Sequence, residues 1–299
     1  MLRFFRAVPD GGQVAGLRLS VLSSGSSGNA TYVECGGTGL LIDAGLSRRR
    51  LENLLARVGR SLGNVDAVLL THDHSDHTCG ARALSRDCGI PVMAPPGVLA
   101  GSKHVPPDAG TSPAGKELAV GDFGVAFFEI PHDSPTYGVR ISGDGRVVAM
   151  ATDLGEAGPE VLRWMRGAEA TVLEANHDPE WLARGPYSAR LKRRISSPHG
   201  HLSNRQAAQV ASSLAPHGLK DLVLAHLSKT NNSPARACGT VHGALREAGY
   251  GGVRVRAAIA NHPTPWIEVG APAEAPEYVY RYARGDARGD AAGQLFGIE

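Results

Sequence analysis

Residues 65–77 have the sequence VDAVLLTHDHSDH, in which an apolar run typical of a buried β-strand leads directly into a cluster of histidines and aspartates. Side chains at alternate positions of an extended chain point to the same side, so we expect His72 and His74 to share one side of the strand end. The turn that follows would bring Asp76 and His77 to an adjacent point in space. The stretch therefore predicts a polar site at the carboxyl end of a strand.

The residue types in this cluster are metal ligands. Imidazole nitrogens and carboxylate oxygens suit zinc, and manganese or iron can occupy similar sites. The three histidines and the aspartate among these ligands lie within residues 72–77 and cannot all reach one tetrahedral ion. Their spacing therefore predicts two neighbouring divalent ions, with zinc expected and manganese or iron as alternatives. The competing interpretation is an exposed polar loop, because Ser, Asp and Thr are ordinary loop residues.

The composition sets the class of protein. With 299 residues, of which 42% are hydrophobic and 20% charged, the chain can build a substantial core, which excludes a disordered protein. The 31 basic and 29 acidic residues nearly balance, so the net charge neither requires nor excludes a polyanionic partner. No stretch approaches the roughly 20 apolar residues that cross a bilayer, so we expect a cytoplasmic protein with no membrane partner. The cysteines show no CxxC spacing and are expected to be buried free thiols: Cys35, Cys79, Cys88 and Cys238.

Short β-rich runs alternate with helical patterns, which predicts a mixed sheet-and-helix layered domain. Strands are expected at residues 17–22, 31–35, 39–43, 65–70, 125–130, 136–141, 146–151, 170–175, 221–226, 253–259 and 266–269. Helices are expected at residues 49–58, 81–87, 160–166, 203–214 and 234–248. Ser203 with Gln206 has the pattern of a capping box, and Ser233 precedes a proline at a first helical position. No linker divides the middle, so we expect one domain over residues 17–269, an N-terminal extension at 1–16 and a flexible tail at 270–299.

The HxHxDH pattern after a buried strand resembles the signature of the metallo-β-lactamase-fold hydrolases. That resemblance implies an α/β (α+β) fold, a four-layer αββα sandwich. It also implies later ligands at strand ends, and His132, Asp153 and His226 follow apolar strands in the expected order. Taken singly, a histidine such as His132 or His226 is more often a satisfied, partly buried structural residue than a ligand, and it is their shared position at strand ends that favours the ligand role.

The resemblance assigns roles to these residues. It implies that one ion is held by His72, His74 and His132, that the other is held by Asp76, His77 and His226, and that Asp153 bridges both. Asp43 would support the metal loop through hydrogen bonds, although a plain turn aspartate is the alternative.

Four further motifs are similar to the compact WalJ/YycJ-type branch of this family, whose members are regarded as 5′-to-3′ exonucleases. The motifs are GSSGNATYVE (25–34), EANHD (174–178), SPHGHLSN (197–204) and LAHLSKTNNSP (224–234). The stretch between Asp153 and His226 is too short for the large β-CASP domain inserted in RNase J-like relatives.

His201 directly precedes the capping box of a helix, whose amino terminus offers unpaired N–H donors to a phosphate. The same resemblance implies that such a histidine contacts the scissile phosphate or assists its leaving group, while an exposed loop histidine is the alternative. Positive charge gathers nearby, at Arg184, Arg190, Lys192, Arg193, Arg194 and Arg205. Substrate contacts are expected from Asn29, His177, His201, Ser203 and Lys229, and catalytic roles from Asp76, Asp153 and His201.

The sequence thus favours a two-metal phosphodiesterase that uses a metal-bound hydroxide to trim the ends of DNA, or of RNA, and the resemblance implies that digestion runs from 5′ to 3′. One alternative is a small-molecule esterase, lactonase or thioesterase, which would use the same metal ions to hydrolyse a bond other than a phosphodiester. A further alternative is a non-catalytic nucleic-acid-binding module.

Overall fold

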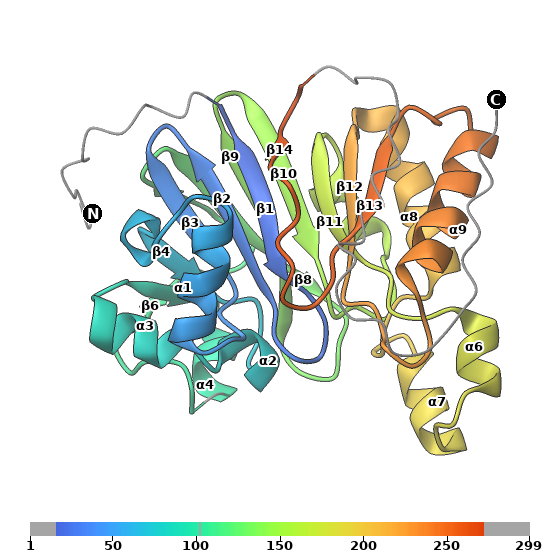
Figure 1. The fold of residues 1–299 in the computed structure, drawn as a ribbon, viewed down its shortest axis with the longest axis horizontal. Helices are drawn as coiled ribbons and strands as arrows, with labels where there is room; N and C mark the ends of the chain where they lie inside the picture. The colour runs from blue at the N-terminus through green and yellow to red at the C-terminus, as the bar shows by residue number, and fades with distance from the viewer. Residues whose placement is uncertain (1–15, 102, 272–299) are drawn as a thin grey trace.

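The computed structural model describes residues 16–101 and 103–271. In these residues, two seven-stranded sheets pack face to face and helices cover the outer face of each, so the predicted αββα sandwich is confirmed (Figure 1). The first sheet has the order β14 (Ile267–Glu268), β1 (Arg18–Ser23), β2 (Ala30–Cys35), β3 (Thr38–Ile42), β4 (Ala67–Leu69), β5 (Val92–Ala94) and β6 (Gly110–Thr111). The second has the order β13 (Arg254–Ala257), β12 (Asp221–Ala225), β11 (Ala170–Glu174), β10 (Arg146–Ala151), β9 (Thr136–Gly143), β8 (Phe123–Ile130) and β7 (Glu117–Val120).

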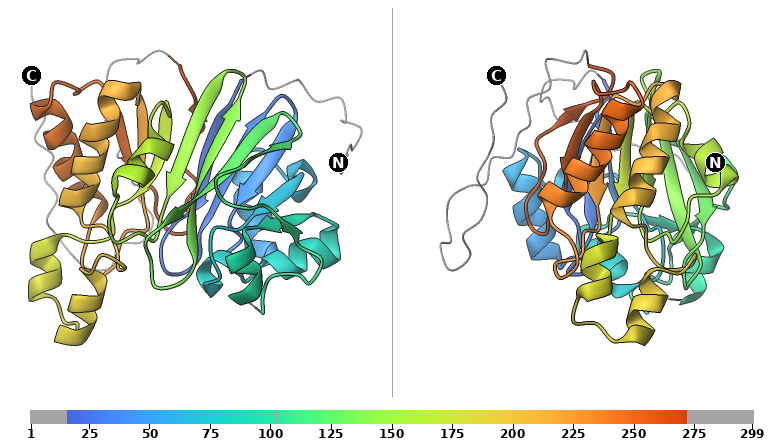
Figure 2. Two further views of the ribbon diagram at one scale, coloured as in Figure 1. Left: turned by 180° about the vertical axis from the view of Figure 1, so that it is seen from behind. Right: turned by 90° about the vertical axis from the view of Figure 1, so that its right-hand side faces the viewer.

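The helices divide between the two sheets (Figure 2). Those beside the first sheet are α1 (Arg48–Arg57), α2 (Ser75–Thr78), α3 (Ala81–Cys88) and α4 (Pro96–Gly101), with the 3-10 turn η1 (Leu62–Asn64). Those on the side of the second are α5 (Pro159–Met165), α6 (Pro179–Arg184), α7 (Ala189–Ile195), α8 (Asn204–Leu214) and α9 (Pro234–Glu247), with the 3-10 turn η2 (Ala215–His217). No helix in the described ranges is both long and apolar enough to cross a bilayer.

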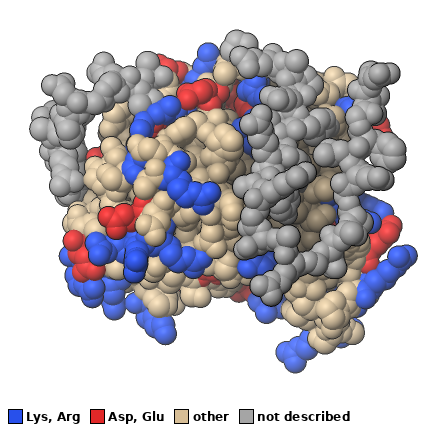
Figure 3. Space-filling model, in the orientation of Figure 1, with Lys and Arg blue, Asp and Glu red and all other residues tan. Residues whose placement is uncertain are grey.

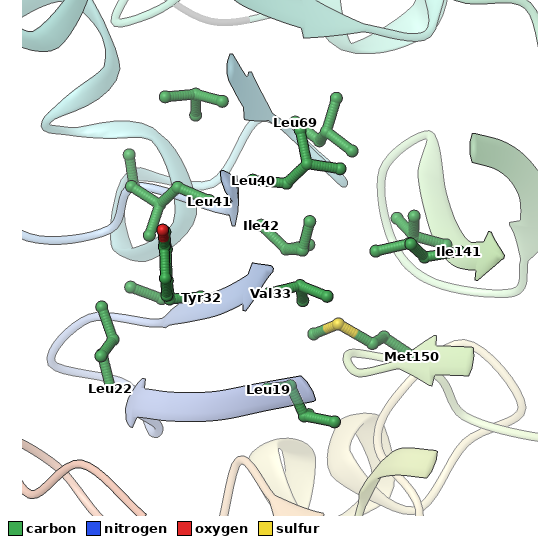
Figure 4. Packing of buried hydrophobic residues seen from close by; sticks show 14 of the residues in the cluster. Leu19, Leu22, Tyr32, Val33, Leu40, Leu41, Ile42, Leu69, Ile141 and Met150 are labelled. Atoms are coloured by element: carbon green, nitrogen blue, oxygen red, sulfur yellow. The ribbon is translucent and has the colours of Figure 1, made fainter. Parts of the chain in front are cut away.

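The core lies between the two sheets and continues under the helices. Val33 and Ile42 of the first sheet point toward Ile141 and Met150 of the second, whereas Tyr32 points to the opposite face (Figure 4). A second apolar cluster joins the other sheet to α8 and α9. Because both faces of the central strands are covered, these strands appear in the sequence as continuous apolar runs.

The strands and helices expected from periodicity are all present, with ends shifted by a few residues. Both predicted caps are confirmed, since the hydroxyls of Ser203 and Ser233 accept bonds from backbone N–H groups of α8 and α9. The sequence analysis missed the elements β5, β6, β7, α2, α4, α6 and α7, which are short or lack an apolar period. The prediction that the free cysteines are all buried was wrong, because Cys79 is exposed and Cys88 half-buried. The predicted extension (1–16) and tail (270–299) lie outside the described residues, except for 16, 270 and 271.

Strand direction brings distant residues to one edge. Strands β10, β11, β12 and β13 are parallel, and β8 runs with them because β9 is antiparallel to both β8 and β10. In the first sheet, β3 and β4 are likewise parallel. The carboxyl ends of parallel strands meet at the same edge of a sheet, which is where ligands bind in open sheets of this kind.

Away from that edge, Glu34 on β2 is a buried carboxylate held by two arginines. It lies 2.6 Å from Arg18 Nε, and 2.7 Å from both Nε and Nη2 of Arg60. The Arg18 guanidinium lies 4.2 Å from the centre of the Trp266 ring. Burial by itself would raise the pKa of Glu34, but hydrogen bonds from Arg60 and Arg18 hold it below its usual value.

We expect Glu34→Gln to lower the free energy of unfolding at pH 7 by about 1–3 kcal/mol, because charge-assisted hydrogen bonds are lost in a buried position. The folded pKa lies below the unfolded value of 4.5, so this stabilisation is present above that pH and is lost as the pH falls through the folded pKa. Urea unfolding at several pH values measures both effects. Glu52→Gln, on the exposed face of α1, is the control, and equal stability of the two variants would contradict the prediction.

Candidate metal centre

Three histidines from two sheets meet at the shared edge. His72 and His74 follow β4, and His132 follows β8. The ring centre of His72 lies 4.7 Å from that of His74 and 5.9 Å from that of His132, and His74 and His132 are 5.4 Å apart. One nitrogen from each lies within 4.8 Å of the other two, a spacing that allows all three to reach one ion.

A second group lies beside the first. Asp76 and His77 belong to the single turn of α2, and His226 follows β12. Asp76 Oδ2 lies 3.8 Å from His77 Nε2 and 3.7 Å from His226 Nε2. These three residues also place one ligand atom each within 4.8 Å of the others.

Asp153, just beyond β10, lies between the groups. Its Oδ2 is 3.1 Å from His77 Nε2 and its Oδ1 is 3.3 Å from His226 Nδ1. Together with His72 and His77 it forms a further set of residues with the spacing of metal ligands. The side chains that the sequence analysis grouped are therefore brought together, with Asp153 in the intermediate position.

The backbone is unusual where it presents these groups. Asp43, Asp153 and His226 have left-handed φ angles of 61°, 60° and 55°. Such conformations are uncommon for non-glycine residues and gather at functional sites. Gly45 is required for close packing, because a Cβ atom there would lie 1.6 Å from the carbonyl oxygen of Asp76.

The buried nitrogens indicate what the site can hold. His72 Nε2 and His226 Nε2 are buried and have no hydrogen-bond partner. An unpartnered polar atom in the interior is costly unless something else satisfies it. Burial and the charge of His77 hold the pKa of His72 well below its usual value, so His72 is neutral and can donate a lone pair. Imidazole nitrogens with carboxylates are a fitting donor set for divalent zinc, manganese or iron.

Asp43 orients His77, as the resemblance implied. It accepts hydrogen bonds from the backbone N of Thr71 at 2.9 Å and from His77 Nδ1 at 2.7 Å. Burial lowers the pKa of His77, but the carboxylates of Asp43 and Asp153 outweigh that effect and raise it to about 10. With Nδ1 bound to Asp43, Nε2 faces the centre.

Glu174, at the end of β11, has a role that sequence reasoning missed. Its fully buried carboxylate lies 2.8 Å from His201 Nδ1 and 2.9 Å from His226 Nδ1. It also accepts bonds from the backbone N atoms of Leu154 and Leu202 at 3.0 and 3.3 Å. Burial alone would raise the pKa of Glu174, but the two histidines hold it below the usual value. In the sequence, the signal for this role was the position of Glu174 at the end of a predicted strand.

His201 lies over the centre and is partly exposed. Its ring centre is 5.2 Å from that of His132 and 5.3 Å from that of His226. Burial lowers the pKa of His201, but Glu174 and Asp153 outweigh that effect and raise it. Because its Nδ1 is directed at Glu174, its Nε2 is the nitrogen left for a substrate.

Asp133 was also missed. Its Oδ1 is 3.1 Å from His132 Nε2 and 3.4 Å from His74 Nε2, and its Oδ2 accepts a bond from Arg194. Asp133 follows His132 in sequence, but only the folded chain brings Arg194 to it. The first histidine group is therefore joined to α7.

The other residues predicted to contact the substrate differ in how deeply they are buried. Asn29 is buried, with Nδ2 2.9 Å from His77 Nε2, and Ser203 uses its hydroxyl to cap α8. Burial lowers the pKa of His177 to about 4. Lys229 is exposed on the loop after β12. Contact of these residues with substrate stays a prediction.

Comparison with known proteins gives the family. Residues 38–227 match the β-lactamase superfamily domain. The chain is 35% identical over 245 residues to exodeoxyribonuclease WalJ of Streptococcus pneumoniae, covering 79% of this chain and 91% of the relative. It is also 35% identical over 243 residues to exodeoxyribonuclease YycJ of Bacillus anthracis, covering 79% and 92%.

Solved structures agree on the fold. The metallo-β-lactamase fold protein YhfI of Bacillus subtilis superimposes with a TM-score of 0.60 at 19% identity, covering 83% of this chain and 98% of that one. The short form of human tRNase Z gives a TM-score of 0.58 at 18% identity, with coverage of 83% and 98%. The chain therefore belongs to the β-lactamase superfamily and is a hydrolase of the metallo-β-lactamase fold.

Proposed function

We propose that the chain is a two-metal exonuclease that removes nucleotides from the 5′ end of DNA. The observation that carries the proposal is the position of His201, a partly exposed histidine directly above both groups of candidate ligands and two residues before the N-cap of α8. The relatives named exodeoxyribonuclease support DNA as the substrate.

The ligand sets are part of the proposal. His72, His74 and His132 would hold one divalent ion, Asp76, His77 and His226 the other, and Asp153 both. When bound, the ions supply Lewis-acid chemistry that lowers the pKa of water and neutralises charge developing on a phosphoryl group. Zinc is the expected metal, with manganese or iron as alternatives.

The chain's own residues would position the phosphate and move the proton. The positive end of the α8 helix dipole favours a phosphate beside His201. Water attacks phosphorus and gives up one proton to the solvent, the bond from phosphorus to the 3′ oxygen of the terminal nucleotide breaks, and His201 Nε2 gives that oxygen a proton. His201 then regains a proton from the solvent. Glu174, 2.8 Å from His201 Nδ1, fixes the ring and stabilises its protonated form. The products are a 5′ mononucleotide and a strand shortened by one nucleotide.

The test uses purified chain, Mn²⁺ or Zn²⁺, and 5′-phosphorylated DNA at low salt. We expect release of mononucleotides from the 5′ end, progressive shortening of a 3′-labelled strand, and loss of both with EDTA. Matched RNA strands, bis-p-nitrophenyl phosphate and chromogenic esters are assayed in parallel. Cleavage of esters with no cleavage of DNA, RNA or the phosphodiester would overturn the proposal in favour of a small-molecule esterase.

A further inference from the structure

Helices α6 and α7, with the turn between them, form an arm over residues 179–195 that projects from the sandwich (Figures 1 and 2). We infer that this arm binds the unpaired DNA strand adjoining the nucleotide under attack, with Trp181 as a base-stacking platform and α7 as a phosphate track. The inference rests on the proposed function and adds the part of the substrate that the metal centre does not reach.

The first observation is exposed apolar surface. In the described part of the chain, the large hydrophobic side chains classed as exposed are Trp181, at 38%, and Leu191, at 37%, and both belong to the arm. The part of the Trp181 indole that stays exposed adds nothing to the burial gained on folding, whereas a base can gain stacking energy on it.

The Trp181 ring is held in place. The guanidinium of Arg236 lies 4.8 Å from its ring centre, and Arg236 Nη1 donates a 2.7 Å bond to Asp178 Oδ2. The other oxygen of Asp178 caps α6 by accepting from the backbone N of Glu180 and of Trp181. A ring fixed in this way loses little conformational entropy when a base stacks on it.

The second observation is uncompensated positive charge. Helix α7 has the sequence ARLKRRI, contains no acidic residue and buries no side chain. Among the described residues, no carboxylate lies within ion-pair distance of Arg184, Arg190 or Arg193, although Arg194 is paired with Asp133. Lys and Arg side chains mark this lower-right corner of the molecule (Figure 3). Unpaired guanidinium groups and an aromatic ring on the same arm are features that bind single strands.

The third observation is continuity with the metal centre. The carbonyl of Ile195, the last residue of α7, accepts a 2.8 Å bond from the backbone N of His201. Gly200 O lies 3.1 Å from His132 Nδ1. A strand leaving His201 can therefore run along α7, which at 1.5 Å per residue spans roughly 10 Å, or about three stacked nucleotides. Stacking on Trp181 requires unpaired bases, so a single strand fits and a duplex does not.

The test compares the variants Trp181→Ala and Arg190→Ala/Arg193→Ala with wild type. Binding is measured by fluorescence anisotropy, with Mn²⁺, on a labelled phosphorothioate single strand of ~12 nucleotides. We expect Trp181→Ala to raise Kd roughly 5- to 100-fold, and Trp181→Phe to restore most of the affinity. The double arginine variant should make the slope of log Kd against log salt shallower by about 1.4. Arg246→Ala, an exposed arginine on α9, is the matched control and should match wild type.

Hydrolysis gives a second readout. The ratio of kcat/KM on the long strand to kcat/KM on a 5′-phosphorylated dinucleotide should fall in the arm variants and stay constant in Arg246→Ala. Wild-type affinity and ratio in both arm variants, or no binding of single strands by wild type, would overturn the inference. If wild type binds strands through the arm but cleaves no DNA, the proposed function fails and the arm inference stands. If wild type degrades DNA and the arm variants do so equally well, the arm inference fails alone.

Discussion

Asp153→Asn should lower the rate of phosphodiester hydrolysis at least about 1,000-fold, the largest effect we expect of any single substitution. Asp153 is the buried carboxylate between the two ligand groups, 3.1 Å from His77 Nε2 and 3.3 Å from His226 Nδ1. Removing its charge should cost several kcal/mol of transition-state stabilisation, and each 1.36 kcal/mol is a tenfold change in rate. Asparagine keeps the shape and tolerates the left-handed φ of 60°.

Metal content measured by mass spectrometry is a readout independent of activity, and we expect fewer ions per chain in Asp153→Asn. The matched control is Asp144→Asn, in the turn between β9 and β10, because Asp144 is exposed and also has a left-handed φ, of 48°. It should keep wild-type rate and metal content. Full activity in Asp153→Asn would contradict the ligand assignment.

His201→Ala should lower kcat on DNA about 100- to 1,000-fold, in the range of a lost general acid. The leaving oxygen would then depart without the proton that His201 supplies. We expect KM to change much less, and metal content to remain that of wild type, because His201 is outside both proposed ligand sets. Steady-state kinetics on 5′-phosphorylated strands, with metal analysis of the same samples, measures both.

The control is His199→Ala, because His199 is exposed and lies two residues earlier on the same loop. It should leave kcat on DNA and metal content nearly unchanged. Glu174→Gln should have an intermediate effect, about 10- to 100-fold, because an amide carries no charge to stabilise protonated His201 and its NH2 group cannot accept the bonds from the backbone N atoms of Leu154 and Leu202. A leaving group that needs no protonation, such as p-nitrophenolate, should reduce the effect of His201→Ala. If the loss were the same on that substrate, or if metal were lost, His201 would be a ligand rather than a proton donor.

The sequence predicted those parts of the site that depend on local spacing. His72, His74, Asp76 and His77 belong to one short stretch after one strand, so their proximity follows from chain geometry. His132, Asp153 and His226 required the family resemblance, because nothing in their own surroundings indicates which strand ends become neighbours. The sheet order then placed them together.

The short elements escaped prediction for a related reason. Helix α7 buries no side chain, so it has no apolar period, and its start depends on the Ser188 cap. The partial exposure of Trp181 could not be recognised either, because tryptophan side chains are highly buried on average.

By itself, the amino-acid sequence determined the layered α/β class, most of the strands, the caps of α8 and α9 and the histidine-aspartate cluster, because these follow from hydrophobic periodicity and from neighbours in the chain. Only the tertiary structure decided that Glu174 serves both His201 and His226, that Arg194 reaches Asp133, and that α6 and α7 leave the body as an arm. Those features depend on contacts between residues far apart in sequence, and such contacts are fixed only when the strands take their order in the sheets.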